Sequence, residues 1–194
     1  MIHKLRLPDE VITEIENWKV ECDKIKNSPL KGLREHDNYG TNTNAYQCSV
    51  PSNLIADSFW LAFTLRSCAE LFGGNHRNYY IRKWNGHFDG YDIWINYSNK
   101  GNYNPTHNHA GKVSGVIYLN NEDETIFTES KYRYKGTKGD MILFPADTLH
   151  GVDRQTKEYE RITFAFNIEY KDPVFAEDEQ LLQKLIKGEY NGWI

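Results

Sequence analysis

Residues 161–169 read Arg-Ile-Thr-Phe-Ala-Phe-Asn-Ile-Glu, and this stretch decides the fold because apolar and polar residues alternate along it. Alternation with a period of two is the pattern of a β-strand whose two faces meet different surroundings. One face holds only Ile and Phe, whereas the other begins with Arg161 and Thr163. A polar strand face usually meets water, but inside a barrel it can line a cavity. There an Arg fork beside a hydroxyl can grip a carboxylate through charge-assisted hydrogen bonds.

Three other segments of this half of the chain have the character of strands. They are short and separated by glycine-containing turns, and they span about 91–97, 113–120 and 140–144. The aromatic share of 14% is high and also favours β structure. Many short strands behind two helices predict a mostly β protein, a barrel or sandwich braced by supporting helices.

Two helices and a long loop are expected before the strands. After Pro8, apolar residues recur at steps of four and three, so one face of the first helix covers something apolar. A second helix is expected over 52–72. Between the helices, 34–48 is rich in Asn, Thr, Gly and Tyr without periodicity, which predicts a loop that is either a lid or a mobile segment.

The length of 194 residues, with no break in composition, fits one domain. Within it we expect a helical N-terminal support over about 1–75 and a β core over about 79–170. A last amphipathic helix is expected over about 177–188, where leucines and an isoleucine share one side.

Charge and hydropathy argue against two classes of partner. The net charge is −4 and no block of Lys and Arg stands out, so we expect no nucleic acid partner. No apolar stretch approaches the ~20 residues of a membrane helix, and the first residues lack the apolar core of a signal peptide. Three cysteines without paired spacing suggest a reducing compartment, so the expected location is cytoplasmic.

Three of the seven histidines stand in an arrangement that suits a metal. His107 and His109 are two residues apart, so in an extended segment both point to the same side. His150 lies 41 residues after His109, where a later strand of a rolled-up sheet could bring it back to the pair. Neutral imidazole suits Fe, Zn, Cu and Ni, so the ligand type does not name the metal. An isolated His-x-His is more often a pair of unrelated histidines, and only its surroundings favour a metal site.

Those surroundings consist of five sequence blocks. They are Asn104-Pro105-Thr106-His107-Asn108-His109, Ser114-Gly115-Val116-Ile117-Tyr118, Gly139-Asp140-Met141-Ile142-Leu143-Phe144-Pro145, His150-Gly151-Val152 and Arg161-Ile162-Thr163-Phe164-Ala165-Phe166-Asn167. In order and spacing they resemble a family of 2-oxoglutarate/Fe(II)-dependent oxygenases that is related to prolyl hydroxylases and often encoded by phages or marine bacteria. The resemblance covers about 91–169. It implies a double-stranded β-helix fold, of the jelly-roll or cupin-like kind.

The resemblance also implies a function and its residues. Fe(II) would be held by His107, His109 and His150, which form the catalytic centre, and the cosubstrate 2-oxoglutarate would be bound by Arg161 and Thr163. The implied activity is that of a dioxygenase, a hydroxylase that couples oxidative decarboxylation of 2-oxoglutarate to hydroxylation of a second substrate. That substrate is a small molecule or a peptide, and the sequence leaves its identity and the oligomeric state open.

The middle ligand position departs from the wider superfamily. The usual set is two histidines and a carboxylate, whereas this chain has His109. Either His109 is a ligand, or it supports the site or contacts the substrate while Asp89, Asp92 or Asp147 coordinates. A three-histidine centre resembles cupin dioxygenases that use no 2-oxoglutarate, which gives the first alternative function. A non-enzymatic jelly-roll module that binds a sugar, peptide or metal is the second.

Two further polar residues are candidates for the cosubstrate pocket. Tyr118 shares a strand face with Ser114 and Val116, and if that face looks inward its hydroxyl could bond the distal carboxylate of 2-oxoglutarate. A packed tyrosine whose hydroxyl is satisfied inside the protein is an equal alternative. Asn96, in the strand before the histidines, could aim its amide at the cosubstrate.

Overall fold

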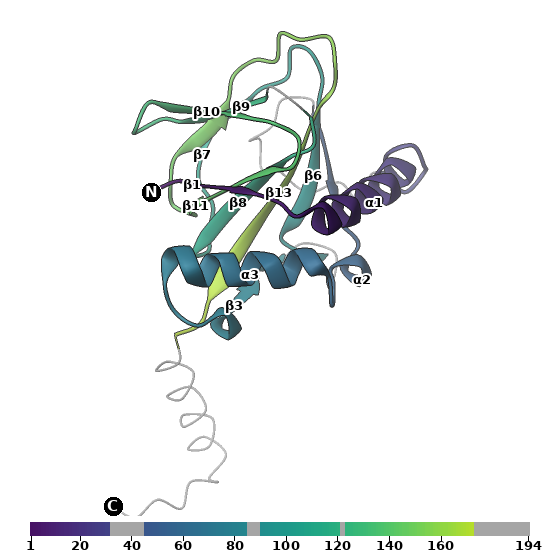
Figure 1. The fold of residues 1–194 in the computed structure, drawn as a ribbon. Helices are drawn as coiled ribbons and strands as arrows, with labels where there is room; N and C mark the ends of the chain where they lie inside the picture. Colours follow the sequence, from purple (N-terminus) through teal and green to yellow (C-terminus); the bar gives the residue numbers. More distant parts are fainter. Residues whose placement is uncertain (32–44, 85–89, 121–122, 173–194) are drawn as a thin grey trace, which may run out of the picture.

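The computed structural model describes residues 1–31, 45–84, 90–120 and 123–172 (Figure 1). The helices are α1 (Asp9–Lys26), α2 (Ser52–Ile55) and α3 (Phe59–Phe72), followed by a 3-10 turn, η2 (His76–Asn78). The strands are β1 (His3–Arg6), β2 (Tyr46–Ser49), β3 (Tyr79–Ile81), β4 (Lys83–Trp84), β5 (Gly90–Tyr91), β6 (Ile93–Ser98), β7 (Asn104–His107), β8 (Val113–Tyr118), β9 (Asp123–Phe127), β10 (Tyr132–Gly136), β11 (Asp140–Pro145), β12 (His150–Val152) and β13 (Arg161–Tyr170).

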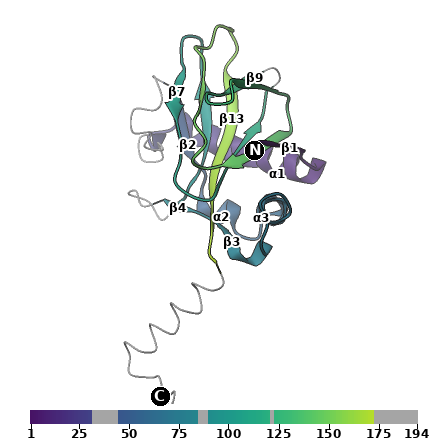
Figure 2. The same cartoon turned by 90° about the vertical axis from the view of Figure 1, so that its left-hand side faces the viewer.

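Two antiparallel sheets form the body of the described chain. The larger has the order β1-β11-β8-β13-β6-β2, with β3 also pairing with β13, and the smaller has the order β10-β9-β12-β7. The long strand β13 runs through the middle of the larger sheet, whereas β7 and β9 lie toward the end of the molecule opposite β3 and α3 (Figures 1 and 2). This arrangement confirms the predicted mostly β jelly-roll, a double-stranded β-helix with supporting helices.

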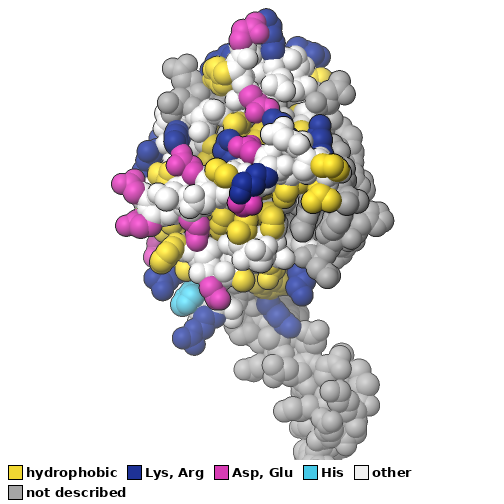
Figure 3. All heavy atoms as spheres, turned by 90° about the vertical axis from the view of Figure 1, so that its right-hand side faces the viewer, with side chains coloured by type: hydrophobic (Ala, Val, Ile, Leu, Met, Phe, Trp, Pro, Cys, Tyr) yellow, Lys and Arg dark blue, Asp and Glu magenta, His cyan; other side chains and the backbone are white. Residues whose placement is uncertain are grey.

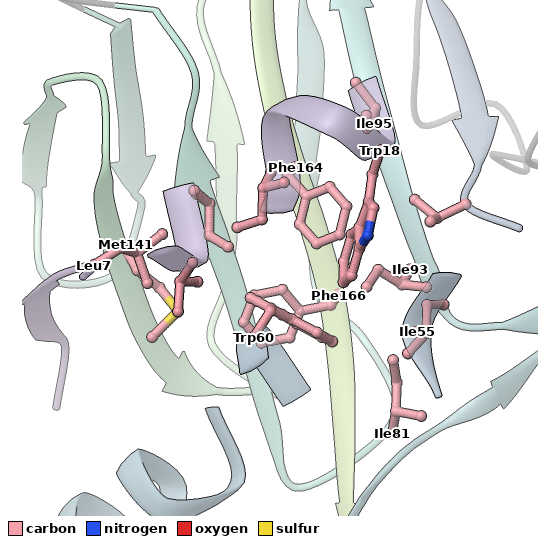
Figure 4. Packing of buried hydrophobic residues seen from close by; sticks show 14 of the residues in the cluster. Leu7, Trp18, Ile55, Trp60, Ile81, Ile93, Ile95, Met141, Phe164 and Phe166 are labelled. Atoms are coloured by element: carbon pink, nitrogen blue, oxygen red, sulfur yellow. The ribbon is translucent and has the colours of Figure 1, made fainter. Parts of the chain in front are cut away.

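The apolar face of β13 forms the main core together with the helices. Trp60 of α3 packs edge-on against both Phe164 and Phe166, with ring centroids 5.6 and 4.9 Å apart (Figure 4). Trp18 of α1 contacts Phe164 at 5.6 Å and Trp60 at 5.7 Å. The predicted apolar face of the first helix therefore covers this side of the larger sheet. The other face of the larger sheet therefore faces the smaller sheet.

The predicted helix over 52–72 is wrong in one respect, because the structure divides it into α2 and α3. The backbone at Asp57 has a positive φ of 60°, which a continuous right-handed helix does not permit. Ser58 then caps α3 by accepting a hydrogen bond from the Leu61 amide at 3.1 Å. The carboxylate of Glu14 accepts from the Trp60 amide at 2.7 Å. Some of the free backbone N–H groups at the N-terminus of α3 are thus bonded by a residue of α1, which is distant in sequence.

The predicted loop over 34–48 is also corrected at its end. Tyr46–Ser49 forms β2, which pairs with β6 at the edge of the larger sheet, with Gln47 opposite Asn96. The rest of that loop, 34–44, lies outside the described residues, as does the helix predicted over 177–188. The other predicted strands are present, although the segment 91–97 is divided between β5 and β6.

No helix in the described ranges is both long enough and apolar enough to cross a membrane. On the face shown in Figure 3, Lys and Arg side chains are interspersed with Asp and Glu side chains around hydrophobic patches. That mixture agrees with the small net charge of −4.

Candidate metal centre and anion pocket

The pairing of two short strands brings the three histidines together. In the smaller sheet, His107 of β7 lies directly opposite His150 of β12. His109 follows β7, and its backbone N–H donates to the carbonyl of Ala146 at 2.8 Å. One potential ligand atom from each of the three histidines lies within 4.8 Å of the others. Such spacing suits a single metal ion, so the three residues predicted from sequence do converge on one point.

Backbone carbonyls set the orientation of two of these rings. His107 Nδ1 lies 2.7 Å from the carbonyl oxygen of Pro105, and His150 Nδ1 lies 2.9 Å from that of Thr148. A carbonyl only accepts, so each Nδ1 carries the hydrogen and each Nε2 keeps its lone pair for a cation.

Burial keeps both imidazoles neutral. It lowers the pKa of His107, although the Pro105 carbonyl opposes the change. For His150, burial and then the neighbouring His107 lower the pKa to about 4, against an opposing effect of the Thr148 carbonyl. Both rings are therefore in the metal-binding, uncharged form at neutral pH.

Gly151 permits the close approach of the strands that carry His107 and His150. A Cβ at this position would lie 2.8 Å from the carbonyl oxygen of Asn104 and 3.2 Å from the amide nitrogen of Thr106, both of β7. Because these neighbours are backbone atoms, they have little freedom to move aside. The pairing of β12 with β7 therefore requires glycine at position 151.

The two described acids among the considered substitute ligands do not join the histidines. Asp92 is 2% exposed and accepts a hydrogen bond from Asn167 Nδ2 at 2.8 Å, on the side of β13 that faces away from the helices. Asp147 is exposed. Neither belongs to the candidate metal cluster found among the described residues, and Asp89 lies outside them.

The histidines open into a cavity between the two sheets. The larger sheet contributes Asn96, Arg161 and Thr163 to its lining, and the smaller contributes His107 and His150. Among the described residues that line it, Arg161 is the only Lys, Arg, Asp or Glu.

Arg161 is a buried cation without an acidic partner among the described residues. Arg161 is only 5% exposed, and its Nη1 donates a hydrogen bond to Thr163 Oγ1 at 3.2 Å. Its Nε is buried and has no hydrogen-bond partner. A buried guanidinium that lacks a counter-ion costs several kcal/mol, by the usual penalty for buried charge. The geometry fits a site that receives an anion from outside the chain.

The other two predicted pocket residues have different surroundings. Asn96 lines the cavity, and its Nδ2 donates to Thr163 Oγ1 at 3.3 Å. Tyr118 is fully buried, with its hydroxyl 2.5 Å from Thr125 Oγ1 and its ring 5.5 Å from that of Tyr134. Its partner Thr125 lines the cavity, whereas Tyr118 lies behind it.

Sequence reasoning missed two cavity residues that carry unsatisfied polar atoms. Asn104 Oδ1 and Gln155 Nε2 are both buried without a hydrogen-bond partner in the described chain. The backbone of Gln155 is fixed to the neighbouring segment, because its N–H donates to the Asn102 carbonyl at 2.7 Å. A lone Gln in an irregular segment carries no periodic signal, so only the tertiary structure reveals its place.

No protein-family model and no curated protein matches the sequence. Solved structures do match. A prolyl-4-hydroxylase from Pseudomonas putida has a TM-score of 0.59 at 11% identity, covering 88% of this chain and 93% of its own. A member of the 2OG-Fe(II) oxygenase family from Burkholderia pseudomallei has a TM-score of 0.58 at 18% identity, covering 86% and 85%.

A third similar structure is HygX from Streptomyces hygroscopicus, with nickel and 2-oxoglutarate bound. Its TM-score is 0.57 at 12% identity, and the match covers 88% of this chain and 83% of HygX. Likeness at these identities shows that the chain shares the fold of these three proteins.

Proposed function

We propose that this chain is a non-haem Fe(II) oxygenase that uses 2-oxoglutarate as cosubstrate and hydroxylates a second, organic substrate. One observation carries the proposal: three histidines, two of them kept neutral by burial, meet at one point in the same cavity as a buried arginine that has no acidic partner among the described residues. A metal ligand set and an anion site in one cavity match a cosubstrate that chelates the metal at one end and carries a carboxylate at the other. The 2OG-Fe(II) oxygenases and the 2-oxoglutarate-bound HygX that share the fold support the same reading.

The cavity residues fall into a metal-binding group and a carboxylate-binding group. His107, His109 and His150 would hold Fe(II), and the carbonyls behind His107 and His150 keep their Nε2 atoms aimed at it. When bound, the iron with O₂ and 2-oxoglutarate supplies the oxidation that hydroxylates a C–H bond. Arg161 and Thr163 neutralise and orient the distal carboxylate, and the walls between the sheets limit the access of water.

His109 favours a second candidate, a three-histidine dioxygenase that cleaves its substrate without 2-oxoglutarate. An imidazole in place of the usual carboxylate leaves one more net positive charge at the metal. In that enzyme Arg161 would bind the substrate itself. The two candidates thus differ in the molecule that satisfies Arg161.

For the second substrate we propose an uncharged polar group of a small molecule or peptide. Once Arg161 is neutralised, no charged side chain remains among the described residues that line the cavity. Asn104 Oδ1 and Gln155 Nε2 then offer an acceptor and a donor that need partners. The three free, buried cysteines of the described chain agree with our proposal that the protein works in the reducing cytoplasm.

The deciding experiment incubates the Fe(II)-loaded protein with 2-oxoglutarate and O₂ and measures succinate. Release of succinate above that of the His107→Ala variant is expected even without the second substrate, as slow uncoupled turnover. If 2-oxoglutarate neither binds the anaerobic Fe(II) protein nor yields succinate, the three-histidine dioxygenase becomes the better explanation.

A further inference from the structure

A row of polar side chains crosses the larger sheet behind the anion pocket. Gln47 of β2 lies opposite Asn96 of β6, and Asn96 lies opposite Thr163 of β13. Their side chains are hydrogen-bonded in the same order. Gln47 Nε2 donates to Asn96 Oδ1 at 2.6 Å, and Asn96 Nδ2 donates to Thr163 Oγ1 at 3.3 Å. The row ends at a hydroxyl that lines the cavity.

Trp94 fixes which way round the Asn96 amide stands. The indole Nε1 lies 3.0 Å from Asn96 Oδ1, and an indole N–H can only donate. The atom of Asn96 that faces Trp94 must therefore be its oxygen. Turning the amide over would set its NH₂ group against the donors of Trp94 and Gln47. The NH₂ group is thus held toward Thr163, as a donor.

Arg161 also requires the Thr163 hydroxyl oxygen to act as an acceptor. A guanidinium can only donate, and Arg161 Nη1 lies 3.2 Å from Thr163 Oγ1. Thr163 Oγ1 consequently accepts two hydrogen bonds, one from Asn96 and one from Arg161. A hydroxyl has two lone pairs and one hydrogen, so only the hydrogen is left to offer. No hydrogen bond from this hydroxyl to an acceptor is made within the described chain.

We propose that Trp94 and Asn96 are positioning residues that hold the Thr163 hydroxyl as a hydrogen-bond donor to a carboxylate bound at Arg161. The inference rests on the proposed function, in which that carboxylate is the distal one of 2-oxoglutarate. If the amide were free to turn, the hydroxyl could donate to Asn96 and present a lone pair to the anion. The carboxylate would then lose the donor of Thr163 and meet a lone pair in its place.

The test is a double-mutant cycle on the full-length Fe(II) protein, read as 2-oxoglutarate affinity under anaerobic conditions. The affinity is followed by metal-to-ligand charge-transfer absorption. Asn96→Leu removes the directing donor, and Thr163→Val removes the hydroxyl but keeps the side-chain shape. Thr163→Val should weaken binding by about tenfold, the usual effect of losing one charge-assisted hydrogen bond. Asn96→Leu should cause part of that loss, because the hydroxyl remains but is no longer held in the donating orientation. In the Thr163→Val background, Asn96→Leu should cost less than about twofold, because it acts through the missing hydroxyl.

A second ligand separates positioning from a general structural role. 2-Oxopentanoate has the same chain length and the same metal-binding end, but a methyl group replaces the distal carboxylate. Its affinity should not change in Asn96→Leu, whereas a distorted metal site would weaken both ligands. Trp94→Phe removes the indole N–H and should reproduce part of the loss for 2-oxoglutarate. The affinity for 2-oxopentanoate should not change, because the variant keeps an aromatic ring beside His109, whose ring centroid lies 5.8 Å from that of Trp94. Asn17→Leu, on an exposed position of α1, controls for the substitution itself.

The outcomes distinguish the two claims. If wild type binds 2-oxoglutarate no better than 2-oxopentanoate, the proposed function fails. If wild type prefers 2-oxoglutarate but the losses from Asn96→Leu and Thr163→Val simply add, or if Asn96→Leu weakens both ligands equally, the positioning role is refuted. Coupled losses confined to 2-oxoglutarate support it.

Discussion

His107 and His150 face each other across the β7–β12 pair with their ring centroids 4.5 Å apart, and each ring is anchored through Nδ1 to a carbonyl two residues earlier. The same hydrogen bond thus orients the ring on both strands, with the carbonyls of Pro105 and Thr148 as the acceptors. Because the two strands also pair backbone to backbone, the distance between the rings is set by the sheet. A metal site built in this way is largely preorganised before the metal arrives.

The first prediction concerns these two ligands. His107→Ala or His150→Ala should abolish tight Fe(II) binding, since either change removes one of the preorganised nitrogens. Metal content after desalting is the measurement. His76→Ala, at an exposed histidine of η2, is the matched control and should retain wild-type iron. Stoichiometric iron in both site variants would show that the metal binds elsewhere.

The second prediction concerns His109. His109→Asp should keep iron, because a carboxylate oxygen restores the usual two-histidine, one-carboxylate set. His109→Leu has no donor atom and should lose much of the affinity. Fe(II) titration of both variants measures the difference. Equal affinity in His109→Leu and wild type would place this residue outside the metal's ligands.

The third prediction concerns the pH dependence of metal-free stability. The pKa of His150 is about 4 in the folded protein and near 6.5 when the chain is unfolded. Between these values the unfolded chain binds more protons, so stability is full above about pH 6.5 and falls as the pH drops toward 4. The loss attributable to His150 is about 3 kcal/mol at most, from about 1.4 kcal/mol per pKa unit.

Urea unfolding of the metal-free protein at pH 7 and pH 4.5 measures this loss. His107, whose pKa is also lowered by burial, adds to the effect in the same direction. In His150→Gln the pH dependence should be flatter, because the substituted side chain does not titrate. An unchanged slope in that variant would mean that other groups account for the acid sensitivity.

The fourth prediction concerns Arg161. Arg161→Leu should weaken 2-oxoglutarate binding by roughly 10²-fold with nearly unchanged iron content, because a charge-assisted bidentate contact is worth a few kcal/mol. Arg161→Lys should fall between, since a point charge keeps the attraction without the fork. Titration of the anaerobic Fe(II) protein gives the affinities. A variant with leucine that binds as tightly as wild type would remove Arg161 from the cosubstrate site.

The fifth prediction uses an unsatisfied buried atom. Gln155→Leu removes a donor, Nε2, that has no partner in the described chain, so stability should rise by roughly 1 kcal/mol or stay unchanged. Iron and 2-oxoglutarate affinity should not change. Denaturant midpoints are the readout. A clear loss of stability would show that the side chain supports the fold and is not kept for a substrate.

Local pattern was enough to predict the parts of this protein whose residues are close in sequence. The alternation over 161–169 predicted both faces of β13, and the packing of Phe164 and Phe166 against Trp60 confirms the apolar one. The apolar spacing after Pro8 likewise predicted the buried face of α1. These features could be predicted because a strand or a helix repeats its direction every two or 3.6 residues, whatever it later packs against.

Tertiary structure decided the features that need a partner far away in the chain. The helix expected over 52–72 breaks where Glu14 of α1 supplies acceptors for a second helix start, and Tyr46 to Cys48 become a strand only because β6 offers an edge. A pattern read along one segment contains no information on such partners.

The candidate site shows the same division. The spacing of His107 and His109 and the Arg-x-Thr pattern at 161–163 are visible in the sequence itself. What brings His150 to His107 is the antiparallel pairing of two strands of only four and three residues, which are too short to show a periodicity. Sheet register decided that Asn96 meets Thr163 on the neighbouring strand. Tyr118 meets Thr125 because the two sheets pack face to face, and such a contact depends on the whole fold.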